Sequence, residues 1–141
     1  MQRFMTTTAL VFAGALLLSG CATSGSGDAA STSAKDGCDT IRSEVRNVSN
    51  GAQNTLATAT DGAATKTYLE GLEDRVDALD EQAGDDTKVE DALEGLKTAL
   101  GDAADYAATI PADGTQDAEA LAAQQSAIQT AANEVSTACA A

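Results

Sequence analysis

The chain has 141 residues, with 22 Asp and Glu against eight Lys and Arg, no His, and a formal net charge of −14. A surface this acidic repels phosphate backbones, so we expect no nucleic-acid partner. The absence of His excludes catalytic triads with a histidine base and zinc sites that require histidine, and no Gly-rich phosphate loop is present. The composition therefore favours a protein that is not an enzyme and carries no cofactor.

The first twenty residues have the pattern of a signal peptide. Arg3 supplies a positive charge, and residues 9–18 read ALVFAGALLL without a polar side chain. A cationic start followed by a short apolar stretch and small residues is typical of a secretory signal, and the stretch is shorter than the ~20 residues that span a bilayer. Leu18, Ser19 and Gly20 then lead directly into Cys21.

This segment resembles the signal sequences of bacterial lipoproteins. Their lipobox has an aliphatic residue, two small residues and a cysteine, which Leu18, Ser19, Gly20 and Cys21 match at all four positions. The resemblance implies that Cys21 becomes the first mature residue and carries a diacylglyceryl group, often with a third, palmitate-like chain on its nitrogen. It also implies a membrane anchor on the extracytoplasmic face of the cell membrane or envelope. Two or three chains anchor stably, whereas a single chain holds only weakly.

Cleavage before Cys21 would change the composition of what remains. Both Phe and both Met lie before Cys21, together with Arg3. Seven Lys and Arg then face all 22 Asp and Glu, which leaves residues 21–141 with a formal charge of −15. The large apolar side chains that remain are mainly Leu, Val and Ile diluted by many Ala, so we expect a thin core, of the kind that often needs a covalent staple.

The sequence divides into three parts: residues 1–20 as signal peptide, 21–35 as lipidated Cys21 and tether, and 36–141 as an acidic helical bundle. The tether is rich in Gly, Ser, Thr and Ala and shows no apolar period. Beyond it, apolar residues recur every three or four positions, which predicts helices over roughly 37–59, 63–83, 87–109 and 116–139. The best-defined stripes comprise Ile41, Val45 and Val48; Leu69, Leu72, Val76 and Leu79; Val89, Leu93, Leu96 and Leu100; and Leu121, Gln125, Ile128 and Val135.

Local signals predict where these helices begin and end. Thr67 begins a possible capping box, although the second helix also has a start signal after Asp61. Gly84 is a natural stop for that helix, Thr87 begins a capping box for the third, and Thr115 is a plausible N-cap for the fourth. Gly71 and Gly95 recur in two Leu-Glu-Gly-Leu repeats, where they indicate either close helix approach or simple tolerance.

The two remaining cysteines constrain the number of helices. Cys38 lies near the start of the first predicted helix and Cys139 near the end of the last. In an up-down-up-down four-helix bundle these ends meet at one pole, whereas three helices of 20 residues would hold them roughly 30 Å apart. A disulfide needs Cα atoms within about 7 Å, so four helices and a Cys38–Cys139 bond are mutually consistent. The alternative is a redox or metal role for this pair.

Function is less constrained than fold. The lipid anchor, the helical domain and the missing catalytic groups favour a non-enzymatic module that interacts with an envelope protein or a cell-wall component. The alternative is a lipoprotein that binds a small ligand or acts as a sensor, with a cavity between helices around Tyr68 and Tyr106. No metal site is expected, apart from a loose divalent-cation site at Asp85 and Asp86 as a minor alternative.

Overall fold

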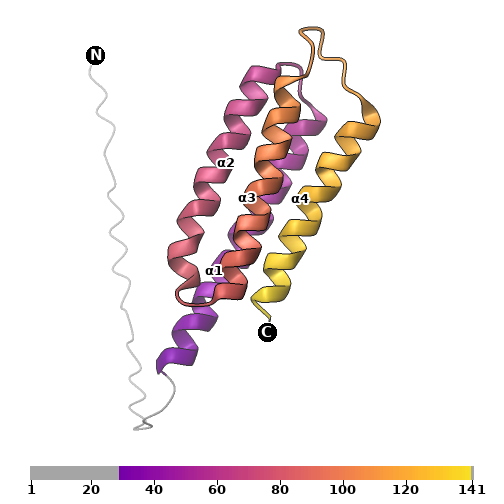
Figure 1. The fold of residues 1–141 in the computed structure, drawn as a ribbon. Coiled ribbons are helices and arrows are strands. Elements are labelled where there is room, and N and C mark those ends of the chain that lie inside the picture. The colour runs from indigo at the N-terminus through magenta and orange to yellow at the C-terminus, as the bar shows by residue number, and fades with distance from the viewer. Residues whose placement is uncertain (1–28, 141) are drawn as a thin grey trace, which may run out of the picture.

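The computed structural model describes residues 29–140, with side-chain surroundings from Gly37 onward. The helices in this range are α1 (Ala29–Ala57), α2 (Gly62–Ala83), α3 (Thr87–Ala108) and α4 (Ala118–Ala138). They run alternately up and down, and the start of α1 lies at the same pole as the end of α4 (Figure 1). Each helix packs against its neighbour along the chain, and α1 also packs against α4, which closes the bundle. The predicted up-down-up-down four-helix bundle is confirmed.

The first helix begins earlier than its apolar stripe indicated. It starts at Ala29, within the range 21–35 that we expected to be tether, and its first turns extend beyond the end of the bundle (Figure 1). Ala-rich sequence has high helix propensity, and adding residues to an existing helix avoids a new nucleation step. The lipobox of Leu18, Ser19, Gly20 and Cys21 lies outside the described residues.

Aspartates cap the N-termini of the other three helices. Asp61 accepts a hydrogen bond from the Ala64 amide, so the later start that we considered at Thr67 is wrong. Asp86 caps α3 in place of Thr87, and Asp117 caps α4 in place of Thr115. Each carboxylate accepts from amides that have no partner within the helix and interacts favourably with the positive end of the helix dipole.

The core follows the predicted stripes closely. The fully buried larger side chains are Ile41, Val45, Val48, Leu56, Leu69, Val76, Val89, Leu93, Leu96, Leu100, Ile128 and Val135. Only the last two of these come from α4, whose other buried residues are Ala131 and Ala132. Ala118, at the first turn of α4, is exposed. The second helix also supplies only two of the fully buried larger side chains, Leu69 and Val76, but it buries Leu72 and Leu79 as well. The fourth helix therefore places the fewest large apolar side chains in the core.

One glycine is required by close packing at the start of α2. A Cβ on Gly62 would clash with the carbonyl oxygen of Ala107 and lie 3.3 Å from that of Ile110. Gly71 has open space around its Cα, and a Cβ on Gly95 would meet only the Glu134 carboxylate at 4.0 Å. Of the two explanations for the repeated Leu-Glu-Gly-Leu segments, tolerance is thus the correct one.

Alanine substitutions at Gly62 and Gly71 should have opposite effects. Gly62→Ala should lower the free energy of unfolding by about 1–3 kcal/mol, because the methyl group forces α2 away from the backbone of the last turn of α3. Gly71→Ala, the matched control, should raise it by roughly 0.5–1 kcal/mol, because Ala favours an exposed helix interior. Urea unfolding followed by circular dichroism measures both changes. Equal effects of the two substitutions would show that the Gly62 contact is not tight.

Candidate functional site

The structure brings the two predicted cysteine partners together. Cys38 lies in α1 and Cys139 is the C-cap of α4, and the two residues approach to 2.5 Å. The structure holds both as partly buried free thiols. Because the bundle has an even number of alternating helices, Cys38 and Cys139 lie in contact at one pole, as expected.

Arg42 links α1 to the end of α4 at the same pole. Its Nη2 donates to the backbone oxygen of Cys139 at 2.5 Å, and its Nη1 lies 3.3 Å from the Asp39 carboxylate. A guanidinium at the carboxyl end of α4 satisfies a carbonyl that the helix leaves open and opposes the negative end of its dipole. Arg42, which the apolar pattern gave no reason to select, therefore joins the first helix to the last.

The protein environment keeps Cys139 in its neutral form. Burial, followed by its hydrogen bond with Cys38, raises the pKa of the Cys139 thiol to about 12. Reactive cysteines have a lowered pKa, because the thiolate is the nucleophile and the metal ligand. This chemistry disfavours the redox or metal role that the sequence left open for the pair.

Gln116 joins the helices at the opposite pole. It lies in the loop between α3 and α4, and its Nε2 donates to the backbone oxygens of Leu56 and Ala59 at 3.1 and 3.2 Å. Its Oε1 accepts from the Tyr106 hydroxyl at 3.3 Å. The end of α1 is thus capped by a side chain from the loop that leads into α4.

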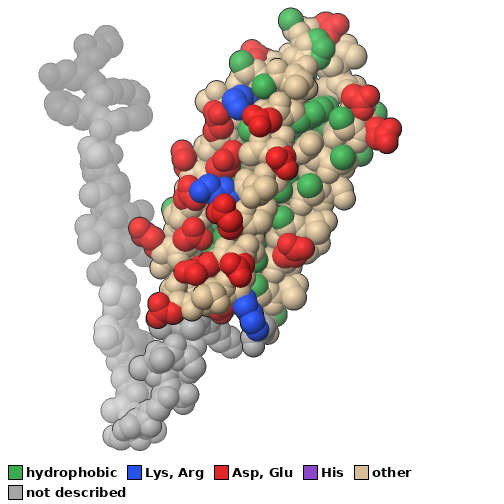
Figure 2. All heavy atoms as spheres, in the orientation of Figure 1, with side chains coloured by type: hydrophobic (Ala, Val, Ile, Leu, Met, Phe, Trp, Pro, Cys, Tyr) green, Lys and Arg blue, Asp and Glu red, His purple; other side chains and the backbone are tan. Residues whose placement is uncertain are grey.

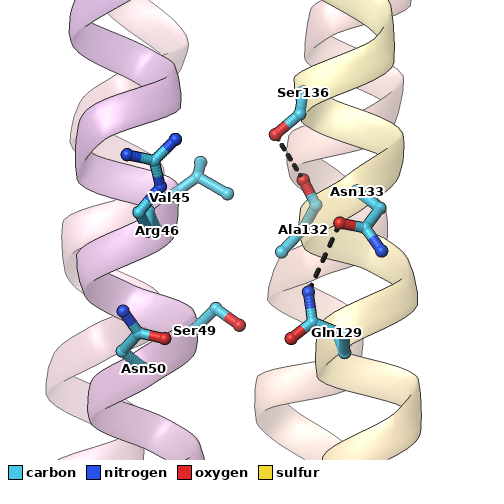
Figure 3. Close-up of a pocket in the computed structure, with 8 residues that line it drawn as sticks. All are labelled: Val45, Arg46, Ser49, Asn50, Gln129, Ala132, Asn133 and Ser136. Atoms are coloured by element: carbon cyan, nitrogen blue, oxygen red, sulfur yellow. Dashed lines mark hydrogen bonds between the residues drawn. The ribbon is translucent and has the colours of Figure 1, made fainter.

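A polar groove runs between α1 and α4 midway between the poles. It has a volume of about 160 Å³ and is lined by Val45, Arg46, Ser49, Asn50, Gln129, Ala132, Asn133 and Ser136 (Figure 3). At its edge, Gln53 donates to Ser49 Oγ at 3.0 Å and to Gln129 Oε1 at 3.1 Å. Gln125, the polar member of the fourth stripe, donates to the backbone oxygen of Gln53 at 3.4 Å. Gln125 of α4 therefore bonds across the bundle to α1.

The seam between α2 and α3 is strongly acidic. Asp and Glu side chains cover much of the face in Figure 2, and Lys66 bridges Glu70 and Asp105 at 3.3 Å each. Burial, and then the charge of nearby Glu70, raises the pKa of Glu73. Exposed ion pairs of this kind contribute little to stability, so this face mainly provides charge and solvation.

The candidate ligand residues and the candidate metal residues are dispersed. Tyr68 is 44% exposed with its hydroxyl beside Gly51 of α1, whereas the Tyr106 hydroxyl faces the α3–α4 loop. Asp86 uses its carboxylate to cap α3. Within the described residues, no three Cys, Asp or Glu side chains are grouped so that they could hold a metal ion. Among the helices of residues 29–140, none combines the length and apolarity needed to cross a bilayer.

Comparison of the chain with known proteins finds no relative. No protein family, curated protein or solved structure matches the chain. Inference about function therefore depends on the residues and their geometry alone.

Cys139 should react very slowly while the reduced protein is folded. A thiol with a pKa of about 12 has roughly a thousandth of the thiolate of a thiol titrating near 9 at pH 8. Alkylation by iodoacetamide under reducing conditions, followed by peptide mass spectrometry, should show about that loss of rate relative to urea-unfolded protein. The folded pKa lies above the unfolded value, so the reduced fold should also lose stability as the pH rises from 9 toward 12. Rapid labelling of folded Cys139 at pH 8 would contradict the burial argument.

Proposed function

We propose that this protein is a lipid-anchored bacterial envelope protein whose acidic four-helix domain acts as a non-enzymatic interaction module. The observation that carries the proposal is Leu18-Ser19-Gly20-Cys21 directly after an apolar stretch that is too short to span a bilayer. On this proposal residues 1–20 are removed, and Cys21 carries acyl chains on the extracytoplasmic face of the membrane. The partner would be another envelope protein or a component of the cell wall.

The bundle itself is consistent with an interaction role. All four helices contribute to one packed apolar interior, while most polar groups lie on the surface and in the α1–α4 groove. The proposed redox chemistry of the cysteines is disfavoured by the raised pKa of Cys139. A second candidate, binding of a small ligand between helices, is favoured by the same groove rather than by Tyr68 and Tyr106.

We infer further that Cys38 and Cys139 form a disulfide once the domain reaches an oxidising compartment. Their contact at 2.5 Å requires little backbone movement for the bond to form. Such a bond would close a loop of about 100 residues, for which the chain-entropy account gives up to roughly 4.7 kcal/mol. A stabilisation of that size is large against the 5–15 kcal/mol that typically separates folded from unfolded domains.

Substitution of Cys21 tests the anchor. Cys21→Ala should move the protein from the membrane fraction to the soluble fraction, because no acyl chain can be attached. The matched control is Cys38→Ala, which also removes one cysteine but should leave the protein in the membrane fraction. Mass spectrometry of the protein without this substitution should find the acyl groups on Cys21. Retention of Cys21→Ala in membranes would rule out lipidation as the anchor.

Reduction tests the disulfide. In the oxidised protein, the peptides that contain Cys38 and Cys139 should be joined, and their combined mass should be lower by two hydrogen atoms than in the reduced protein. Reduction should cost about 2–4 kcal/mol of stability, which for a domain of this size lowers the melting temperature by roughly 10 °C or more. The double variant Cys38→Ser/Cys139→Ser should melt at the same temperature with and without reductant. Two free thiols in protein isolated without reductant from its native compartment would refute the bond.

A further inference from the structure

The α1–α4 groove differs in charge from the rest of this acidic molecule. None of its eight lining residues is Asp or Glu, and one of them, Arg46, is cationic. The groove between α2 and α3, in contrast, is lined by Glu70, Glu73, Asp102 and Asp105 around the single cation Lys66. An anion that approaches the α1–α4 groove therefore meets a positive charge without an adjacent carboxylate in the wall.

The carboxylates nearest to the groove along each helix belong to other seams. Glu44 lies two positions before Arg46, but its Oε2 is 2.6 Å from Arg75 of α2. Glu134 lies next to Asn133, but its Oε2 is directed at Gly95 of α3, at 4.0 Å from the position of a Cβ there. Helical geometry thus sends both charges to the flanks and leaves the groove free of acidic side chains.

The groove presents hydrogen-bond donors that the fold does not use. Ser49 is only 3% exposed and points from α1 toward α4 (Figure 3); its oxygen accepts from Gln53, but its hydroxyl donates to no residue in the described range. Asn133 Oδ1 accepts from Gln129 at 3.3 Å, which leaves the Asn133 amide group as a donor. A buried hydroxyl without an acceptor normally finds one in a bound molecule or in water.

Arg46 supplies the charge at the rim of the groove. Its side chain is exposed and lies on α1 one turn from Asn50, with the guanidinium directed along the helix away from Asn50 (Figure 3). The ion pairs of residues 37–140 involve Arg42, Lys66, Arg75 and Lys97, so Arg46 is not held by an acidic partner within this range. A guanidinium on a flexible stem can turn over the groove and bind a carboxylate through two parallel hydrogen bonds.

We propose that the α1–α4 groove binds the carboxylate of a small ligand that also carries an amide or hydroxyl group beside it. Arg46 pairs with the carboxylate, Ser49 and Asn133 donate to its oxygens or to a neighbouring carbonyl, and Asn50 binds the adjacent polar group. A volume of about 160 Å³ is below that of a drug-sized site and matches a fragment such as one sugar or one acylated amino acid.

Two sources would present this chemistry to an envelope protein: a carboxylate-bearing amino sugar and the carboxyl end of a short peptide. The choice of these two sources rests on the proposed function, whereas the groove and its donors do not. The shared element is a carboxylate near an acetamido or peptide carbonyl, and it is this element that the groove complements.

Paired probes separate the two sources. The full chain, isotopically labelled and held in detergent micelles, is titrated with N-acetylmuramic acid and, separately, with its counterpart without a carboxylate, N-acetylglucosamine. The second pair is acetyl-D-alanyl-D-alanine and the same peptide with a C-terminal amide. We expect at least one acid to shift the backbone signals of Ser49, Asn50, Gln129 and Asn133 in a saturable manner, and its neutral counterpart to bind at least tenfold more weakly. The acid that binds identifies the source.

Variants test whether the groove itself is responsible. Arg46→Gln should weaken binding by about tenfold or more, Arg46→Lys by less because it keeps the charge, and Ser49→Ala by several-fold. Lys88→Gln, which makes the same charge change outside the groove, should leave the affinity unchanged. Failure of both acids to shift these signals, equal binding of neutral probes, or equal loss in Arg46→Gln and Lys88→Gln would overturn the proposal. None of these outcomes bears on the anchor, which membrane fractionation of Cys21→Ala measures independently.

Discussion

The structure depends on closing the first helix against the last. The two helices are separated in sequence by α2 and α3, and α4 contributes only Ile128 and Val135 as large buried apolar side chains, where each of the other helices contributes four. Apolar burial at roughly 25 cal/mol per Å² therefore holds α4 less firmly than the others. Polar contacts at the two ends of the bundle compensate: Arg42 donates to the backbone oxygen of Cys139 at the end of α4, and Gln116 donates to backbone oxygens at the end of α1.

The groove is a consequence of that polar closure. In α2 and α3, four Leu or Val side chains from each helix belong to the buried apolar core. Where α1 and α4 meet, Gln53 of α1 donates across the seam to Gln129 of α4 and also to Ser49 within α1. Amide and hydroxyl groups need partners at fixed distances and angles, so they fill space less completely than branched aliphatic side chains do. Polar contacts thus take the place of apolar packing at the α1–α4 seam. They weaken the seam, but they leave room for a ligand and provide donors that can bind it.

The sequence predicted most of the fold because apolar residues with a period of 3.6 identify helices and their inner faces. It missed the N-caps by one or two positions, because Asp and Thr residues stand side by side and only the backbone geometry decides between them. It did not identify Ala99, Ala104 and Ala131 as buried, because Ala is common on both faces of a helix. Arg42 and Gln116 were beyond its reach, because their partners lie on distant segments and no local pattern records such a pairing. The meeting of Cys38 and Cys139 was within reach, because it follows from helix parity alone.

An anchor changes how much affinity a shallow groove needs. A site of about 160 Å³ without an aromatic platform makes few contacts, and small ligands gain at most about 1.5 kcal/mol per non-hydrogen atom even in the best cases. Binding through such a groove would be weak for a freely diffusing protein. A protein held on a membrane beside a repeating polymer meets an effective ligand concentration in the millimolar range, where weak sites are occupied. The proposed anchor at Cys21 and the proposed carboxylate site on α1 and α4 are therefore physically compatible. The anchor would supply the high effective concentration at which a weak site is occupied. The acidic α2–α3 face would meanwhile oppose non-specific adhesion to an anionic matrix and leave the α1–α4 groove, with the positive charge of Arg46, as the favoured side of contact.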